Sequence, residues 1–469
     1  MPILNFEGYS SLIRRGYKAA KKQEAQFLKL KEKLDKYFAP DKPKFPLKLP
    51  DKFFIEDVNI ERESNAFSSM IECAFGWVEE QSIGEKDIFE ATTQVYSTKN
   101  IENFNYSFSE GTLGQKLKLD YTPLRESKIG LTLNHFPQTN TSLIASGELR
   151  NMLFPLSKIF GVLRVSDNPA FFGDFYQRVG DKRNYIIGLS SDIERMVDPI
   201  YLDGTIAREF ITTYFKVSGS LKKELNITSM AEVKYEFSSS QFKPKIIRME
   251  DLREVVLHQH FLETSISYNN IDKWAYPSTG HLLKASARIG LTGFQKVDYS
   301  VSDAEDKFNV PTSNSVILIK GLAREYLKLN DSWNLVLSGS IGIRPSNALL
   351  DYFPVGGTDN YTTEALPFIG AAQNEFRMGN YTYGRVSLRN KIAGKIHCSF
   401  VGNFLYGKSD NSIFLNPEEG SDDYFSHFGY GISLGFESIV GPVNVDFGTK
   451  DGFENTSFTV GVGYSFRDN

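Results

Sequence analysis

The chain has 469 residues, more than one ordinary domain, so we expect two or three folding units. Its 53 Lys and Arg residues nearly balance its 57 Asp and Glu residues, and the net charge of −4 argues against a nucleic-acid-binding protein. Aromatic residues make up 13%, which excludes a disordered chain, and together with 37 glycines they are typical of a β-rich protein. No apolar run reaches about 18 residues, so no transmembrane helix is predicted.

Residues 5–38 are expected to form one amphipathic helix, because apolar residues such as Phe27, Leu30 and Leu34 recur at spacings of three, four or seven. The opposite face is basic, and such a helix either lies on an anionic membrane surface or, as the commoner case, docks on a globular neighbour. Four prolines in residues 39–52 indicate an extended linker, so residues 1–52 form an N-terminal segment. Residues 1–30 lack the apolar core of a secretory signal, so if the protein is exported we expect Met1 to lie inside a longer reading frame.

Residues 53–122 predict a small α/β unit. Residues 53–61 alternate as a strand, and helices follow from Phe67 to about Val78 and from Glu85 to about Tyr96. Two short strands then complete the order β-α-α-β-β.

Residues 123–469 predict a transmembrane β-barrel, because apolar residues alternate with polar or small residues throughout. A soluble β-protein alternates in the same way, but polar faces rich in Ser, Gly, Asn and Thr favour a hydrated lumen. An even number of strands suits a closed antiparallel barrel, and each membrane strand needs roughly ten residues. We count 16 candidate strands, with cores near residues 127, 140, 157, 170, 183, 206, 226, 254, 280, 314, 332, 381, 394, 427, 442 and 456.

A small β-α-α-β-β unit followed by 16 strands resembles the bacterial surface antigen superfamily of outer-membrane assembly and secretion barrels. The resemblance implies that residues 53–122 form a POTRA (polypeptide-transport-associated) domain. The hairpin between the eighth and ninth predicted strands resembles the superfamily's D…YP-x-x-G motif, carried here by Asp272, Tyr276, Pro277 and Gly280. The same Pro and Gly spacing also makes an ordinary turn.

A second motif opens the long loop between the eleventh and twelfth predicted strands, which we expect to run from about Arg344 to Asn380. The stretch FPVGGTDN, with Gly356 and Gly357, resembles the superfamily's F-x-x-GG motif. A loop of this length without predicted structure is usually functional. The resemblance implies a loop that reaches into the lumen.

The tip of this loop departs from the superfamily. The superfamily's tip is Arg-Gly-aromatic and pairs with an acid of the barrel wall, whereas the sequence here is Pro367-Phe368-Ile369-Gly370 and the nearest arginine is Arg377. We expect packing and backbone hydrogen bonds to replace the ion pair, because Phe368 and Ile369 favour burial and glycine allows close approach. Substitution of Gly370 is therefore expected to disturb the barrel more than loss of the Arg377 charge.

The loop and residues 3–20 together resemble the branch in which the barrel is fused to a patatin-like phospholipase, and residues 1–52 would be the tail of that domain. A patatin hydrolase needs a serine on a strand-to-helix elbow. The string Gly431-Ile432-Ser433-Leu434-Gly435 instead lies in a predicted strand with no helix after it. We therefore assign no catalytic residue to this chain and leave open whether the parent protein is an enzyme.

Metal and cofactor sites are not predicted. His258 and His260 share one strand face, but no third ligand is apparent, and we expect them in the lumen or in a loop. Cys73 fits a helix core, and Cys398 fits the apolar face of its strand.

The prediction is a mainly β protein of the bacterial outer membrane with its POTRA-like unit in the periplasm. It would be the membrane-anchoring or translocation part of a patatin-like phospholipase protein, or alternatively an outer-membrane assembly or secretion barrel unrelated to lipolysis. We expect outer-membrane lipid as a partner, leave a homodimer open, and expect no nucleic acid.

Overall fold

The computed structural model describes most of the chain, which divides into two units, Met1–Phe53 and Phe54–Asn469. The described residues are 17–37, 52–60, 65–98, 100–124, 127–136, 140–180, 184–202, 204–247, 252–273, 276–299, 316–344, 352–357, 366–409, 424–438, 441–452 and 455–462.

In the first unit, residues 17–37 are helical except for a turn at Gln23, and helix α2 spans Glu24–Tyr37. The other residues of the predicted helix 5–38 lie outside the described part. The apolar side chains of Phe27, Leu30 and Leu34 are about half exposed.

The second unit begins with a small α/β fold whose sheet has the strand order β2-β1-β4-β3. Strand β1 runs parallel to β4, and β3 runs antiparallel to β4. Alternate residues of β4 are buried under the helices, as shown by the Phe67–Tyr121 ring contact at 6.0 Å. The elements are β1 (Phe53–Ile60), α3 (Asn65–Phe75), β2 (Ser82–Ile83), α4 (Glu85–Ser97), β3 (Ile101–Glu110) and β4 (Gln115–Pro123).

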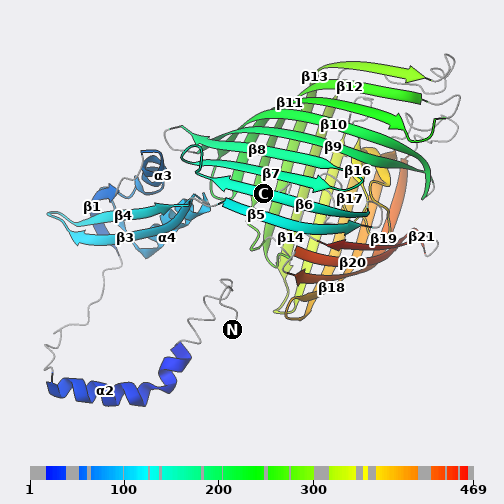
Figure 1. The fold of residues 1–469 in the computed structure, drawn as a ribbon. Helices are drawn as coiled ribbons and strands as arrows, with labels where there is room; N and C mark the ends of the chain where they lie inside the picture. Colours follow the sequence, from blue (N-terminus) through cyan, green and yellow to red (C-terminus); the bar gives the residue numbers. More distant parts are fainter. Residues whose placement is uncertain are drawn as a thin grey trace. The chain divides into compact units, whose positions relative to one another are not determined.

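The rest of the second unit is a closed barrel in which each strand pairs with its sequence neighbours and β21 closes onto β5 (Figure 1). Its strands are β5 (Ser127–Phe136), β6 (Asn140–Arg150), β7 (Ser157–Val165), β8 (Ala170–Val179), β9 (Tyr185–Leu202), β10 (Thr205–Glu224), β11 (Ser229–Pro244), β12 (Leu252–Asn269), β13 (Gly280–Tyr299), β14 (Ile317–Lys328), β15 (Trp333–Ile343), β16 (Phe353–Val355), β17 (Phe376–Ala393), β18 (Ile396–Ser409), β19 (Tyr424–Ser438), β20 (Gly441–Lys450) and β21 (Asn455–Val462).

The predicted fold class is confirmed, and the 16 predicted strands correspond to β5–β15 and β17–β21 among the described residues. Strand β16 is an addition of three residues, which the alternation pattern is too short to reveal. Strand β15 pairs directly with β17, and β16 pairs with the first residues of β17 beyond the end of β15.

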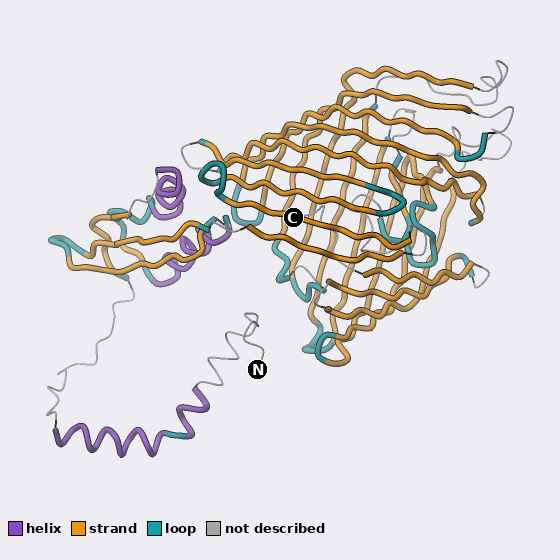
Figure 2. Tube along the Cα trace, viewed as in Figure 1, coloured by secondary structure: helices purple, strands orange, loops and turns teal. Residues whose placement is uncertain are grey.

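The barrel turns its apolar side chains outward, which is the reverse of a soluble protein and suits a lipid environment. Figure 2 shows that the barrel wall is almost entirely strand. Large side chains exposed on the wall include Ile129, Leu189, Phe215, Ile289, Phe400 and Phe447. Within the described part of the chain, no helix is both long and apolar enough to cross a membrane.

Candidate functional site: a loop and a hairpin in the barrel lumen

The long connection between β15 and β17 is partly structured. It ends at Glu375 rather than at the predicted Asn380, because residues from Phe376 onward already pair with β16 and β18 as strand β17. Of this connection, Arg344 and residues 352–357 and 366–375 are described. Two bridges, Val355–Leu366 and Gly357–Phe368, fold the loop onto itself.

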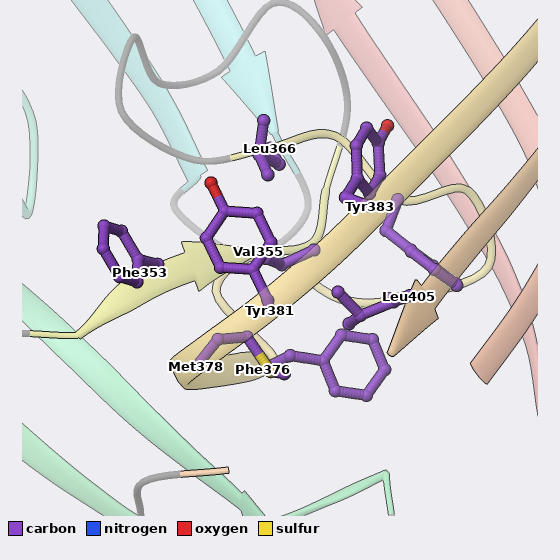
Figure 3. Packing of buried hydrophobic residues seen from close by; sticks show 10 residues of the cluster. Phe353, Val355, Leu366, Phe376, Met378, Tyr381, Tyr383 and Leu405 are labelled. Atoms are coloured by element: carbon purple, nitrogen blue, oxygen red, sulfur yellow. The ribbon is translucent and has the colours of Figure 1, made fainter. Parts of the chain in front are cut away.

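The loop buries an apolar cluster against the inner wall of the barrel. Val355 and Leu366 from the loop face the rings of Tyr381 and Tyr383 on β17 (Figure 3). Phe368 is fully buried, with its ring 5.5 Å from that of Phe376. The cluster contains Phe353, Val355, Leu366, Phe368, Ala371, Phe376, Met378, Tyr381, Tyr383 and Leu405.

Hydrogen bonds fix the tip of the loop to β17 and β18. The carbonyl oxygen of Pro367 accepts hydrogen bonds from the Tyr383 hydroxyl at 2.5 Å and from Asn403 Nδ2 at 3.3 Å. The backbone N–H of Ile369 donates to Asn403 Oδ1 at 3.1 Å. Asn403 therefore binds the backbone of the tip on both sides of Phe368.

Glycines on the inner wall make room for the tip. A Cβ atom at Gly429 of β19 would lie 2.3 Å from the Ile369 carbonyl oxygen, and one at Gly448 of β20 would lie 2.5 Å from Ile369 Cγ1. In the loop itself, Gly370 has φ +90°, and a Cβ there would lie 2.4 Å from the carbonyl carbon of Thr449. The loop tip and the wall can approach this closely only because Gly370, Gly429 and Gly448 carry no side chain.

Two buried ion pairs accompany the loop, and they correct our expectation that packing and backbone hydrogen bonds alone would hold it. Arg377 Nη2 lies 2.7 Å from Asp198 Oδ1, and the two side chains are only 1% and 3% exposed. Glu375 forms a second buried ion pair with Lys450 of β20. The sequence could not reveal these pairs, since their members are 179 and 75 positions apart and only barrel closure brings them together.

The hairpin between β12 and β13 is organised by Asp272. Its carboxylate accepts backbone hydrogen bonds from Ser278 at 2.8 Å and Thr279 at 3.3 Å, together with one from the Ser278 hydroxyl. Burial raises the pKa of Asp272, but these hydrogen bonds outweigh it, and the pKa of this carboxyl falls below its ordinary value. Gly280 then begins β13 and pairs with Tyr326.

Tyr276 and Pro277 attach this hairpin to the distant strands β17, β18 and β20. The Tyr276 ring stacks on that of His397 at 4.3 Å, and its hydroxyl donates to Asn444 Oδ1 at 2.5 Å. Arg389 Nη1 donates to the Pro277 carbonyl oxygen at 3.1 Å. Because consecutive connections of an antiparallel barrel alternate between its two ends, the hairpin and the long loop enter the lumen from opposite ends.

The GxSxG string has a structural explanation in this arrangement. Ser433 lies within β19, opposite Ser399 and Asp446, and β20 follows directly, so the serine is on no elbow. A Cβ atom at Gly431 would lie 2.8 Å from Ile369 Cδ1, and one at Gly435 would lie 2.5 Å from the Tyr276 hydroxyl. These two glycines accommodate the loop and the hairpin respectively.

The histidines predicted to lie in the lumen or in a loop are in the wall and face outward, so this expectation was wrong. His258 and His260 belong to β12 and stack with aromatic rings of the neighbouring strands, including the exposed Tyr235 and Phe294. His260 pairs with Phe237 of β11, and His258 pairs with Phe294 of β13, so both histidines share the outward face of these aromatic residues. The described residues contain no cluster of three or more metal-binding side chains.

Sequence reasoning missed Asp198, Asn403 and the small inward face of β19. The run Gly429, Gly431, Ser433 and Gly435 was interpreted only as a polar lumen face. The three glycines on one face of this strand could have revealed the packing of the loop. A strand interior rich in glycine often marks the close approach of another backbone.

The closed barrel with its outward apolar side chains defines this chain as an outer-membrane β-barrel protein. Residues 184–466 match the model of the OMP85 superfamily, which covers more than half of the chain, and the chain therefore belongs to that superfamily. This confirms the superfamily that the sequence motifs indicated, while the patatin-like resemblance finds no support in the comparisons.

Solved structures agree on the fold. BamA from Haemophilus ducreyi lacking POTRA domains 1–3 has a TM-score of 0.60 at 12% identity, over 87% of this chain and 84% of that one. CdiB from Escherichia coli has a TM-score of 0.57 at 11% identity, over 87% and 76%. CdiB from Acinetobacter baumannii has a TM-score of 0.55 at 12% identity, over 88% and 74%. A comparison with curated proteins finds no match.

Proposed function

We propose that this chain is an outer-membrane assembly or secretion barrel, the function that we gave as the alternative. Membership of the OMP85 superfamily and the shared fold with BamA and CdiB support this function better than the link to a phospholipase. The observation that carries the proposal is the occupied lumen, in which a loop from one end and a hairpin from the other pack on the same wall strands.

The geometry supports a closed resting state. The loop tip is fixed by Asn403 and Tyr383, and the hairpin is fixed by Tyr276. Both contact β19 and β20, the two strands that precede β21, which closes the barrel onto β5. A client polypeptide would enter only after one of these contacts is released, so we assign the loop and the hairpin the role of gating elements.

The small α/β unit would act as a POTRA domain on the periplasmic side. Its order β-α-α-β-β and its mixed sheet, with β1 parallel to β4, support this assignment. Strand β3 lies at the edge of this sheet and its residues are exposed along most of its length, which suits recognition of extended polypeptides. Outer-membrane lipid is the partner that the apolar outer wall supports, and a homodimer remains a proposal.

Depletion of the protein in its native bacterium tests the proposal. We expect the amounts of specific outer-membrane or secreted proteins to fall, because their assembly route is lost. Phospholipid composition should stay constant. An unchanged outer-membrane and secreted proteome, with altered phospholipid turnover, would instead support the phospholipase link.

A further inference from the structure

Helix α2 carries an apolar stripe that is about half exposed in the described part of the chain. Phe27, Leu30 and Leu34 follow one another at spacings of three and four, which places them on one face of the helix. Their side chains are 53%, 52% and 47% exposed. Three large apolar side chains in a row on a helix of 14 residues indicate a face that meets an apolar partner.

The charges around this stripe are mostly positive. Residues 17–34 contain six lysines and two glutamates, a formal charge of +4. Lys29 and Lys33, four residues apart, share the face next to the stripe, and all of these side chains are exposed. A helix with a modest apolar stripe and a lysine-rich polar face has the composition of one that lies in a membrane interface.

Lys31 decides between a lipid and a protein as the partner. It follows Phe27 by four residues and precedes Leu34 by three, so it lies within the apolar stripe. In a packed protein interface this ammonium group would need an acidic partner or would be costly to bury. At a membrane surface its aliphatic stem lies along the apolar region while the charge reaches the head groups.

We propose that α2 binds an anionic lipid surface, with Phe27, Leu30 and Leu34 in the interface and the lysines on lipid phosphates. The observations that carry this inference are the exposed stripe, the lysine inside it and the charge complementarity to anionic head groups. The inference is independent of the proposed assembly or secretion function.

The test uses the full chain with Cys73→Ser and Cys398→Ser and one new cysteine that carries an environment-sensitive fluorophore. Leu34→Cys reports on the stripe. Ala25→Cys is the matched control, because residues nine positions apart on an α-helix point in opposite directions. The protein is reconstituted into vesicles of phosphatidylcholine, alone or mixed with phosphatidylglycerol, that contain a lipid with a nitroxide on its acyl chain. The heat-modifiable migration of the barrel verifies folding in every sample.

We expect the nitroxide to quench the label at position 34 but not at position 25, and only in vesicles with phosphatidylglycerol. High salt should reverse the quenching. The double change Lys29→Gln with Lys33→Gln should also reverse it, by lowering the ratio of lipid-bound to unbound helix α2 about tenfold or more. Equal quenching in neutral vesicles would overturn the proposal. So would a blue-shifted but unquenched label at position 34, because that result means the stripe docks on protein.

Discussion

Arg377 and Asp198 form a buried ion pair across the barrel, with 2.7 Å between Nη2 and Oδ1. Arg377 is the second residue of β17 and Asp198 lies near the end of β9, and these strands are almost opposite in the order of the barrel wall. Tyr352, just before β16, lies against both, with its ring 4.5 Å from the guanidinium carbon. The pair therefore ties the loop region to the far wall and narrows the lumen.

The first prediction concerns the stability of this pair. Arg377→Gln should lower the free energy of unfolding by about 3–5 kcal/mol, because it leaves the Asp198 carboxylate buried without its cation. The control is Lys328→Gln, which breaks the exposed Lys328–Asp331 pair and should leave the free energy of unfolding almost unchanged. Urea unfolding in lipid vesicles measures both values.

A double change separates an ion pair from simple packing. Arg377→Met combined with Asp198→Leu should recover much of the loss, because replacing both members of a buried pair by apolar residues is often neutral. If Arg377→Gln is no worse than Lys328→Gln, the pair does not hold the loop region and our interpretation of it is wrong.

The second prediction concerns the loop tip. Single cysteines at residues 366–372 should be unreactive toward a bulky external thiol reagent on intact cells, because the tip is buried against β17–β20. Gly370→Val should make them reactive, since its side chain would overlap the Thr449 backbone and its φ of +90° disfavours valine. Gly402→Val is the control, because a Cβ there has no neighbour within 4 Å. Reactive cysteines throughout the unmodified loop would show that it lies outside the lumen.

The third prediction separates the two contacts of Tyr276. Tyr276→Phe should lower the free energy of unfolding by about 1 kcal/mol, because it removes only the hydrogen bonds of the hydroxyl to Asn444 and to the Val443 carbonyl oxygen. Tyr276→Ala should cost about 3 kcal/mol, because the stacking on His397 is also lost. The control is Tyr268→Phe, at the start of the same hairpin. This change removes an exposed hydrogen bond from Asn270 Nδ2 to the Tyr268 hydroxyl and should leave the free energy of unfolding almost unchanged. Equal effects of the Tyr276 and Tyr268 phenylalanine changes would mean that the hairpin is not docked.

The fourth prediction is a pH dependence at Asp272. The pKa of Asp272 is lower in the folded hairpin than in the unfolded chain. The ionised carboxylate therefore contributes fully to the free energy of unfolding above about pH 4, and this contribution is lost as the pH falls through the folded pKa. Asp272→Asn should therefore unfold at a lower urea concentration than the unmodified protein at pH 5, and the difference in urea concentration should narrow as the pH falls below about 4. A gap that stays constant over this range would show that the carboxylate charge is not responsible.

The local patterns were sufficient to predict the architecture. Each wall strand can be predicted from the alternation of its own apolar and polar side chains. The Asp272 hairpin can be predicted from its turn residues. Strand β16 was missed because three residues show no period, and the end of the loop was misplaced because Phe376–Asn380 have no alternation of their own.

The contacts inside the lumen could not be predicted in the same way. Asp198, Asn403 and the glycines of β19 acquire their roles only when the barrel closes and places distant strands side by side. The outward orientation of His258 and His260 is visible only from their pairing with Phe294 and Phe237 on the neighbouring strands. Information of this kind is contained in pairing and register, which a single sequence does not display.

The most direct test of the closed, gated barrel is a reversible lock on the loop. A cysteine pair at Ile369 and Gly448 should form a disulfide, because Ile369→Cys removes the side chain whose Cγ1 lies 2.5 Å from the position of a Cβ at Gly448, and the cysteine sulfur takes the place of that atom. With Cys73 and Cys398 replaced by serine, cells depleted of the native protein express this variant, and the amounts of its client outer-membrane or secreted proteins are measured with and without reductant. We predict that the oxidised barrel fails to restore them and that the reduced barrel restores them. Full restoration by a completely cross-linked barrel would contradict the claim that the loop must leave the lumen wall for the protein to work.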